Sequence, residues 1–182
     1  MNYNISLIYS SIFNGTEVLV LCLVILNAFK IHPININKQT LICAINYLLM
    51  FGSLLFTVSL LSELFMAYYT QNEYAQFSFS NRLAGPFWFD IWLIGVLSFM
   101  ILPQILWIKR LRKSFTASII IVGIWLALYF VKQALIAFQA WHTEFKSSYS
   151  EYIIRAIIYS VLLLTSYFIV QRKTNRSYIS KA

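Results

Sequence analysis

Long apolar segments, almost free of charged residues, most constrain what this chain can fold into. Five of them occupy residues 5–29, 41–69, 87–108, 116–140 and 152–170. A run of about 20 apolar residues is long enough for a helix to cross the hydrocarbon core of a bilayer. Because lipid offers the backbone no hydrogen-bond partners, such runs satisfy their own amides as helices. The pattern predicts an all-α, polytopic membrane bundle of five transmembrane helices.

The composition supports this class and argues against others. Hydrophobic residues make up 60% of the chain and charged residues 11%, which leaves too little polar surface to cover a soluble core. The mean hydropathy of +0.71 agrees. The formal net charge is +8, but the cations flank the apolar segments and form no polar, basic domain for nucleic acid. We expect one helical domain over residues 1–182 that contacts the lipid bilayer and binds no nucleic acid.

The distribution of cations between the apolar segments predicts the orientation. The connections after the first, third and fifth segments are rich in Lys and Arg, whereas the other two contain Glu73, Glu144 and Glu151. Cytoplasmic loops carry the excess of cations, so we expect the N-terminus outside and the C-terminus in the cytoplasm. The cations in those three connections are Lys30, Lys38, Lys109, Arg110, Arg112, Lys113, Arg172, Lys173, Arg176 and Lys181.

The sequence allows two starting points for the first helix. Asn14 and Glu17 have the spacing of a capping box, which would start a helix there. Only about a dozen apolar residues would then remain, too few to cross about 30 Å at 1.5 Å per residue. We therefore expect the helix to begin near residue 5, with Glu17 inside it and facing protein. Residues 70–85 are expected to form a loop, and residues 171–182 a polar tail.

Ionisable residues inside the apolar segments are the candidate functional residues, because charges in a bilayer are costly. Glu63 lies about 10 Å below the outer end of its helix, and Lys132 about 12 Å below the outer end of its own. Matching depths predict an ion pair between them, since a buried charge without its partner costs about 3–5 kcal/mol. Asp90 and Arg155 are expected nearer the same surface.

Two interpretations of this polar cluster stay open. In the first, its polar pairs fix how the helices pack, a structural role that Arg155 and Glu17 would share. In the second, Glu63, Asp90, Lys132 and His142 form a quinol head-group pocket or the mouth of a proton path. We favour the first.

Pro103 and Gln104 interrupt the third apolar segment. Proline frees a backbone carbonyl, which Gln104 is expected to satisfy. A structural kink and a water-lined path are both consistent with this pair, and we favour the kink.

The histidines argue against a haem. His32 and His142 fall in connections on opposite sides of the membrane, so they cannot both ligate one haem between facing helices. No carboxylate and His spacing indicates another metal site, and no nucleotide-binding or nucleophile motif occurs. We expect no metal and no catalytic activity from this chain on its own.

Three short segments resemble a known family. They are SELFMAYY at residues 62–69, NRLAGPFW at residues 81–88 and LPQILWIK at residues 102–109. Their order and spacing are similar to those in the NrfD/polysulfide-reductase membrane subunits, and most of all in the quinol-side membrane subunits of bacterial alternative complex III. The likeness covers only the C-terminal half of such a subunit. Glu63 matches an acidic position of the family, whereas Lys132 stands where the family tends to have an acidic residue.

The resemblance implies a quinol-linked respiratory electron-transfer complex in the inner membrane of a bacterium, with other membrane and periplasmic subunits as partners. Because the usual quinone pocket belongs to the half that is missing here, we expect a mainly structural, accessory subunit. One alternative is a subunit that binds quinol or conducts protons through Glu63, Asp90 and His142, with quinone as its cofactor. A further alternative is an unrelated small transporter or membrane anchor.

Overall fold

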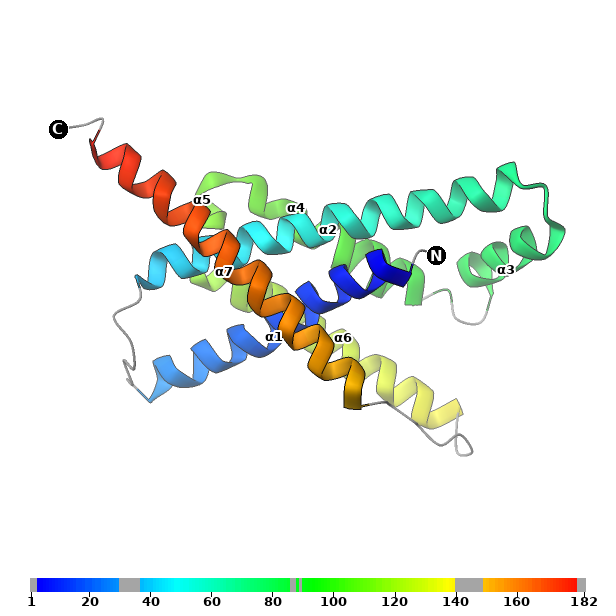
Figure 1. Ribbon diagram of the computed structural model, residues 1–182. Helices are drawn as coiled ribbons and strands as arrows, with labels where there is room; N and C mark the ends of the chain where they lie inside the picture. Colours follow the sequence, from blue (N-terminus) through cyan, green and yellow to red (C-terminus); the bar gives the residue numbers. More distant parts are fainter. Residues whose placement is uncertain (1–2, 30–36, 86–87, 89, 140–148, 180–182) are drawn as a thin grey trace.

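The computed structural model describes residues 3–29, 37–85, 88, 90–139 and 149–179, and all the regular elements in these ranges are helices. Figure 1 shows long helices that cross one another around α2. In chain order the elements are α1 (Tyr3–Ala28), α2 (Lys38–Tyr69), α3 (Glu73–Ala84), the π-helix η1 (Asp90–Ile101), α4 (Leu102–Gln104), the 3-10 helix η2 (Ile105–Trp107), α5 (Lys109–Arg112), α6 (Phe115–Gln139) and α7 (Tyr149–Ile179).

Four helices are long and apolar enough to span a membrane. The candidate spans are Asn4–Ala28, Lys38–Tyr69, Phe115–Gln133 and Tyr152–Thr174. They agree with four of the five apolar segments, and α1 runs unbroken through Asn14 and Glu17, as the length argument predicts. Helix α2, with 32 residues, is about 48 Å long and therefore exceeds the hydrocarbon core.

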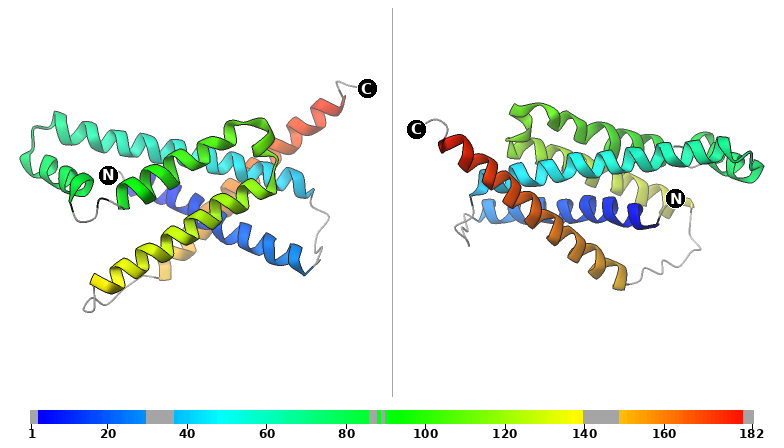
Figure 2. Two further views of the ribbon diagram at one scale, coloured as in Figure 1. Left: turned by 180° about the vertical axis from the view of Figure 1, so that it is seen from behind. Right: turned by 45° about the horizontal axis from the view of Figure 1, so that its top comes forward.

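The remaining apolar segment is shorter and less regular than predicted. Its apolar helical part is Ile91–Trp107 rather than residues 87–108. It starts as a π-helix, tightens through α4 into a 3-10 turn, and ends where Ile108 adopts an extended backbone. Pro103 lies at this transition and cannot donate an amide hydrogen bond, which accounts for the change of helix type. The segment runs back along α2 (Figure 2).

One other expectation is wrong, and the structure adds a detail about the polar tail. Most of the predicted loop at residues 70–85 is helix α3, because the side chain of Asn72 accepts hydrogen bonds from the amides of Tyr74 and Ala75 and starts a helix. The predicted polar tail is largely helical, since α7 continues to Ile179. Its residues after position 170 include Gln, Arg and Lys, which are good helix formers.

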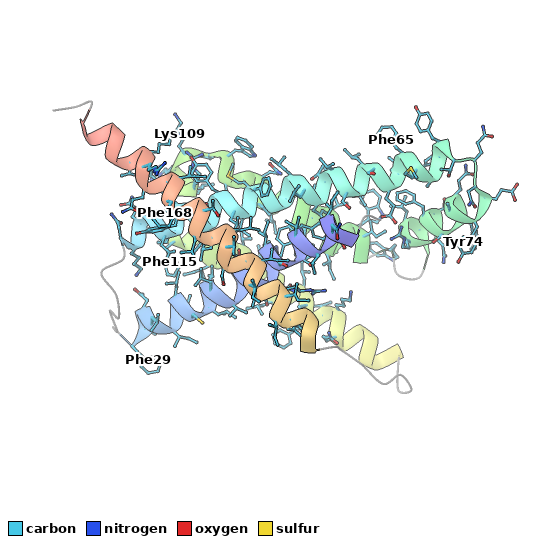
Figure 3. All side chains as sticks on the ribbon, viewed as in Figure 1. Phe29, Phe65, Tyr74, Lys109, Phe115 and Phe168 are labelled. Carbon is cyan, nitrogen blue, oxygen red and sulfur yellow. The ribbon has the colours of Figure 1, made fainter. Side chains whose placement is uncertain are left out.

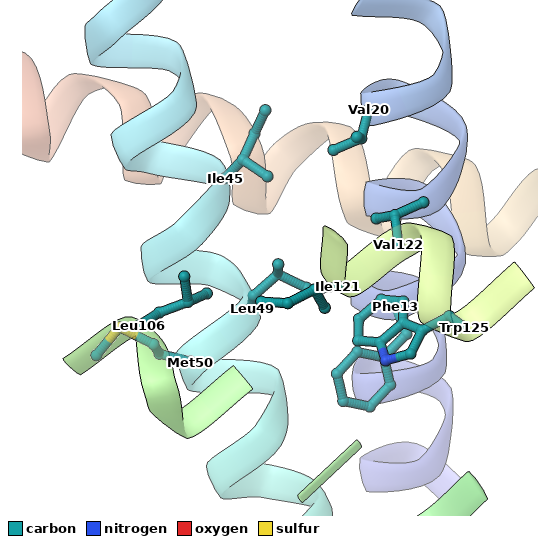
Figure 4. Packing of buried hydrophobic residues seen from close by; sticks show 9 residues of the cluster. All are labelled: Phe13, Val20, Ile45, Leu49, Met50, Leu106, Ile121, Val122 and Trp125. Atoms are coloured by element: carbon teal, nitrogen blue, oxygen red, sulfur yellow. The ribbon is translucent and has the colours of Figure 1, made fainter. Parts of the chain in front are cut away.

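The core lies where α1, α2 and α6 meet η1. The ring of Phe13 stacks on that of Phe99 at a centroid distance of 4.5 Å, and the ring of Trp125 meets both edge-on. Figure 4 shows Phe13 beside Trp125, with Ile121 and Leu49 next to them. Rings in these arrangements stabilise a core beyond the area they bury. The buried members of this cluster are Phe13, Val20, Ile45, Leu49, Met50, Leu106, Ile121, Val122 and Trp125.

Two glycines of the membrane-spanning helices let their neighbours approach closely. A Cβ atom added to Gly15 of α1 would lie 2.1 Å from the Tyr159 ring of α7. One added to Gly52 of α2 would lie 2.8 Å from the Cγ2 atom of Ile12. Small residues at helix crossings are typical of membrane bundles, where close packing rather than water exclusion drives association. The crossing of α1 and α7 thus depends on Gly15.

We expect Gly15→Ala to lower the free energy of unfolding by about 1–3 kcal/mol, because the added methyl group displaces the Tyr159 ring. Gly52→Ala has a smaller effect, because the nearest atom to the added methyl group, Ile12 Cγ2, is 2.8 Å away rather than 2.1 Å. Gly123→Ala is the matched control, since a Cβ atom there meets no other atom within 4 Å. Unfolding of the purified protein in detergent, followed by circular dichroism, measures all three. Equal stabilities of the Gly15 and Gly123 variants would contradict the packing at this crossing.

Candidate functional site

An ion pair between α2 and α3 is the centre of the candidate site. The guanidinium of Arg82 donates a hydrogen bond to the carboxylate of Glu63. Helix α3 folds back beneath the last turns of α2 (Figure 1), and Arg82 of α3 contacts Glu63 of α2. The Glu63 side chain is 22% exposed and that of Arg82 46% exposed. The carboxylate is therefore compensated by a neighbouring cation that water still reaches.

The partner predicted for Glu63 is wrong. We expected Lys132, because the two residues share a depth in the membrane, but Glu63 is paired with Arg82. The C-terminal ends of α2 and α6 diverge in Figure 1, so equal depth does not bring their side chains together. Lys132 is half-buried on α6 and takes part in other interactions.

Among the other predicted site residues, those whose side chains the structure describes do not join this ion pair. Arg155 lies on α7, half-buried. Asp90 is the first residue of η1, but its side chain falls outside the described residues, as does the whole of His142. Glu17 is half-buried on α1, which agrees with a position facing protein. Of the predicted candidates with described side chains, only Glu63 belongs to the pocket described next.

A small pocket adjoins the ion pair. It has a volume of about 290 Å³ and lies between α2, α3 and η1. Among the described residues of its wall, Ser59, Glu63 and Arg82 are polar and the others are apolar. The apolar residues are Phe56, Leu60, Ile91, Ile94, Gly95 and Phe99. The volume is near the lower limit for ligand pockets, so the space suits one ring-sized group with a few convergent polar contacts.

Three contacts hold the walls of this pocket together. The indole Nε1 of Trp92 donates to the carbonyl oxygen of Leu83 at 3.0 Å, which ties η1 to α3. The rings of Phe56 and Phe99 meet edge-on at 5.9 Å, which ties α2 to η1. With the Glu63 and Arg82 pair, each of the three helices is therefore linked to the other two. Chemically, the pocket offers a carboxylate acceptor opposite guanidinium and hydroxyl donors.

Pro103 and Gln104 are part of a hydrogen-bonded chain, arranged differently from the prediction. Ser53 Oγ donates to the Met100 carbonyl at 3.0 Å, and Gln104 Nε2 donates to Ser53 Oγ at 2.8 Å. Trp107 Nε1 then donates to Gln104 Oε1 at 2.6 Å. A serine of α2, rather than Gln104, thus satisfies a carbonyl near the proline. This arrangement supports a structural kink.

The sequence analysis missed several buried polar residues that link helices. Asn46 Nδ2 donates to the Arg112 carbonyl at 2.8 Å, and Ser118 Oγ donates to Asn46 Oδ1 at the same distance. Trp125 Nε1 donates to the Ser98 carbonyl at 3.0 Å. The available signal was an amide or hydroxyl within an apolar segment, which marks helix contacts in membranes. That signal is weak, because serine is frequent in such helices.

The described part of the chain holds no group of three or more His, Cys, Asp and Glu side chains placed to bind a metal. Cys22 and Cys43 are free thiols. Comparisons with protein-family models, curated proteins and solved structures found no match to this chain. Inferences about function therefore depend on the residues and on the geometry described above.

The partner of Glu63 is testable by double-mutant cycles. We expect a coupling energy of about 1 kcal/mol between Glu63→Gln and Arg82→Gln, since this pair is partly exposed to solvent. The cycle of Glu63→Gln with Lys132→Gln gives a coupling close to zero. Free energies of unfolding in detergent supply both values. A larger coupling to Lys132 than to Arg82 would restore the partner that depth alone predicts.

Proposed function

We propose that this chain is an integral membrane subunit of a quinol-linked respiratory electron-transfer complex in the inner membrane of a bacterium, and that its main role is structural. The observation that carries the structural role is the use of its intramembrane polar groups. Glu63 is compensated by Arg82, and Asn46 and Ser53 hold neighbouring helices. Polar groups committed to helix packing favour a scaffold over a catalytic centre.

The quinol-linked assignment is supported by how the three family-like segments are arranged. Residues 62–69 and 81–88 contribute Glu63 and Arg82 to one ion pair. Residues 102–109 contact the same helix, α2, through Gln104 and Ser53. Segments that resemble one family are thereby joined around α2, as parts of a common structural unit would be.

We further propose five membrane crossings, with the N-terminus outside. The segment Ile91–Trp107 supplies the additional crossing, because it runs back along α2 (Figure 2). Its end, the start of α2 and the C-terminal half of α7 lie at the same end of the bundle (Figure 1). Lys38, the cations of residues 109–113 and Lys173 therefore gather at one membrane surface, which supports a cytoplasmic location for that surface.

Other subunits would cover the apolar surface that this chain exposes. In an apolar 18-residue window of α7 only 11% of the residues are buried, compared with 50% in that of α2. The exposed side chains of α7 include Ile153, Ile157, Val161, Leu164 and Phe168. Lipid and neighbouring membrane subunits of the complex would both suit this face.

The membrane complex containing this chain, isolated in mild detergent, tests the assignment. We expect the chain to migrate with iron–sulfur or haem proteins, identified by mass spectrometry and by their visible spectra. Quinone is also extracted from the whole complex, as a second sign of a quinol-linked assembly. Migration as a free oligomer, with no redox partner, would instead support a transporter or a membrane anchor.

A second candidate function is quinol binding in the pocket next to Glu63. The observation that favours it is the pocket itself, with its carboxylate, guanidinium and hydroxyl in an otherwise apolar wall. A quinol hydroxyl would donate to Glu63, and a quinone oxygen would accept from Arg82 or Ser59. The pocket is large enough for a single ring.

Glu63→Gln separates the two candidates. If the role is structural, we expect quinol oxidation per assembled complex to stay within about twofold of the wild type, because the shape of the side chain is kept. Loss of a general base would instead lower turnover by about 10²–10⁴-fold with assembly intact. Glu73→Gln is the control, since this exposed carboxylate of α3 lies outside the pocket. Quinone extracted from the isolated chain would also favour the second candidate.

A further inference from the structure

A second, larger groove lies at the opposite end of α2 from the Glu63 pocket. It has a volume of about 1120 Å³ and is formed by the first turns of α2, the region of α5 and the C-terminal half of α7. Figure 3 shows Lys109 and Phe168 at this end of the bundle. The groove therefore lies where the cationic connections of the chain meet its membrane-spanning helices.

The polar part of the groove is strongly basic. Among its described lining residues five are cations and none is acidic. The five cations are Lys109, Arg110, Arg112, Lys113 and Lys173. Cations crowded together without a carboxylate repel one another, and an anion placed between them removes that repulsion. The groove is complementary to a negatively charged group.

Arg112 is held in a defined place within this groove. Asn46 Nδ2 donates to its backbone carbonyl, and its guanidinium lies 4.5 Å from the centre of the Tyr47 ring. Its Nε atom is buried and has no hydrogen-bond acceptor among the described residues. A planar guanidinium with an unused donor is suited to phosphate oxygens, which accept two parallel hydrogen bonds.

The groove continues from these cations into an apolar part. Leu48 and Phe51 of α2 line it on one side, and Leu162 and Ile169 of α7 on the other. Along α7, Lys173 and Leu162 are about 16 Å apart, roughly half of the hydrocarbon thickness of a bilayer. A site for a free phosphate needs only the cations, whereas an anionic head joined to acyl chains matches both parts.

We propose that this groove binds one anionic phospholipid, with its phosphate between Arg112 and Lys173 and an acyl chain between α2 and α7. Basic pockets between membrane helices are suited to such headgroups. The bound lipid would fill the space between α7 and α2, two helices also joined where Ser166 Oγ donates to the Ala44 carbonyl at 3.0 Å. Lipid binding here stabilises the packing of α7.

The full chain in detergent, titrated with phosphatidylglycerol and analysed by native mass spectrometry, tests this site. We expect one tightly retained lipid, and an affinity about fivefold lower for each cation removed in Arg112→Gln and Lys173→Gln. Arg172→Gln is the matched control, because it removes the neighbouring charge on α7, which lies outside the groove. Circular dichroism verifies that each variant is folded. Equal losses in all three variants would mean diffuse surface attraction and overturn the site.

Two further measurements distinguish the ligand. Phosphatidylcholine, which has the same chains and no net charge, is expected to bind at least tenfold more weakly, and equal binding overturns the proposal. Inorganic phosphate is expected not to displace the lipid, and displacement at equal concentrations would assign a free-phosphate site.

Leu162→Trp fills the apolar part without changing a charge. It is expected to weaken lipid binding, and unchanged binding would contradict the place of the acyl chain.

Discussion

The buried amide of Asn46 is the interaction on which much of this structure depends. It is fully buried, and it joins α2 to α6 through Ser118 and to α5 through the Arg112 carbonyl. An amide in an apolar interior is costly unless its donors and acceptor are used. Once they are used, the amide fixes both the rotation of α2 and the position of α5. The place of Arg112 over the Tyr47 ring follows from this.

The π-helix η1 makes a comparable contribution at the other end of α2. Its wider turns change the backbone hydrogen bonds, and Ser98 Oγ donates to the carbonyl of Leu93, five residues earlier. The Ser98 carbonyl accepts from Trp125 Nε1 of α6. Single-turn π-bulges frequently occur at functional sites, and η1 is a longer stretch of the same geometry. Four of the residues lining the Glu63 pocket, Ile91, Ile94, Gly95 and Phe99, lie on it.

Length and apolarity are local properties, and they were enough to predict four long helices and the unbroken path of α1 past Asn14. The partner of Glu63 is not local. The depth of a residue along its helix does not indicate which neighbouring helix its side chain faces. In addition, the helix that carries Arg82 was expected to be a loop. The capping residue Asn72 is in the sequence, but the segment after it lacks the long apolar run on which the helix predictions depended. The links made by Asn46 and Ser53 were missed because no sequence pattern indicates which residue a buried serine or asparagine contacts.

Charged groups near the two ends of α2 are compensated in two different ways. At the end near Glu63, the charge of the carboxylate is compensated by Arg82 from the same chain, and a small apolar pocket forms beside a neutral pair. At the other end, the groove collects five cations and no carboxylate. Charges near a membrane are stable when paired with protein, with water or with lipid headgroups. With no acidic lining residue there, the proposed anionic lipid supplies the compensation at the basic end that Arg82 supplies at the acidic one.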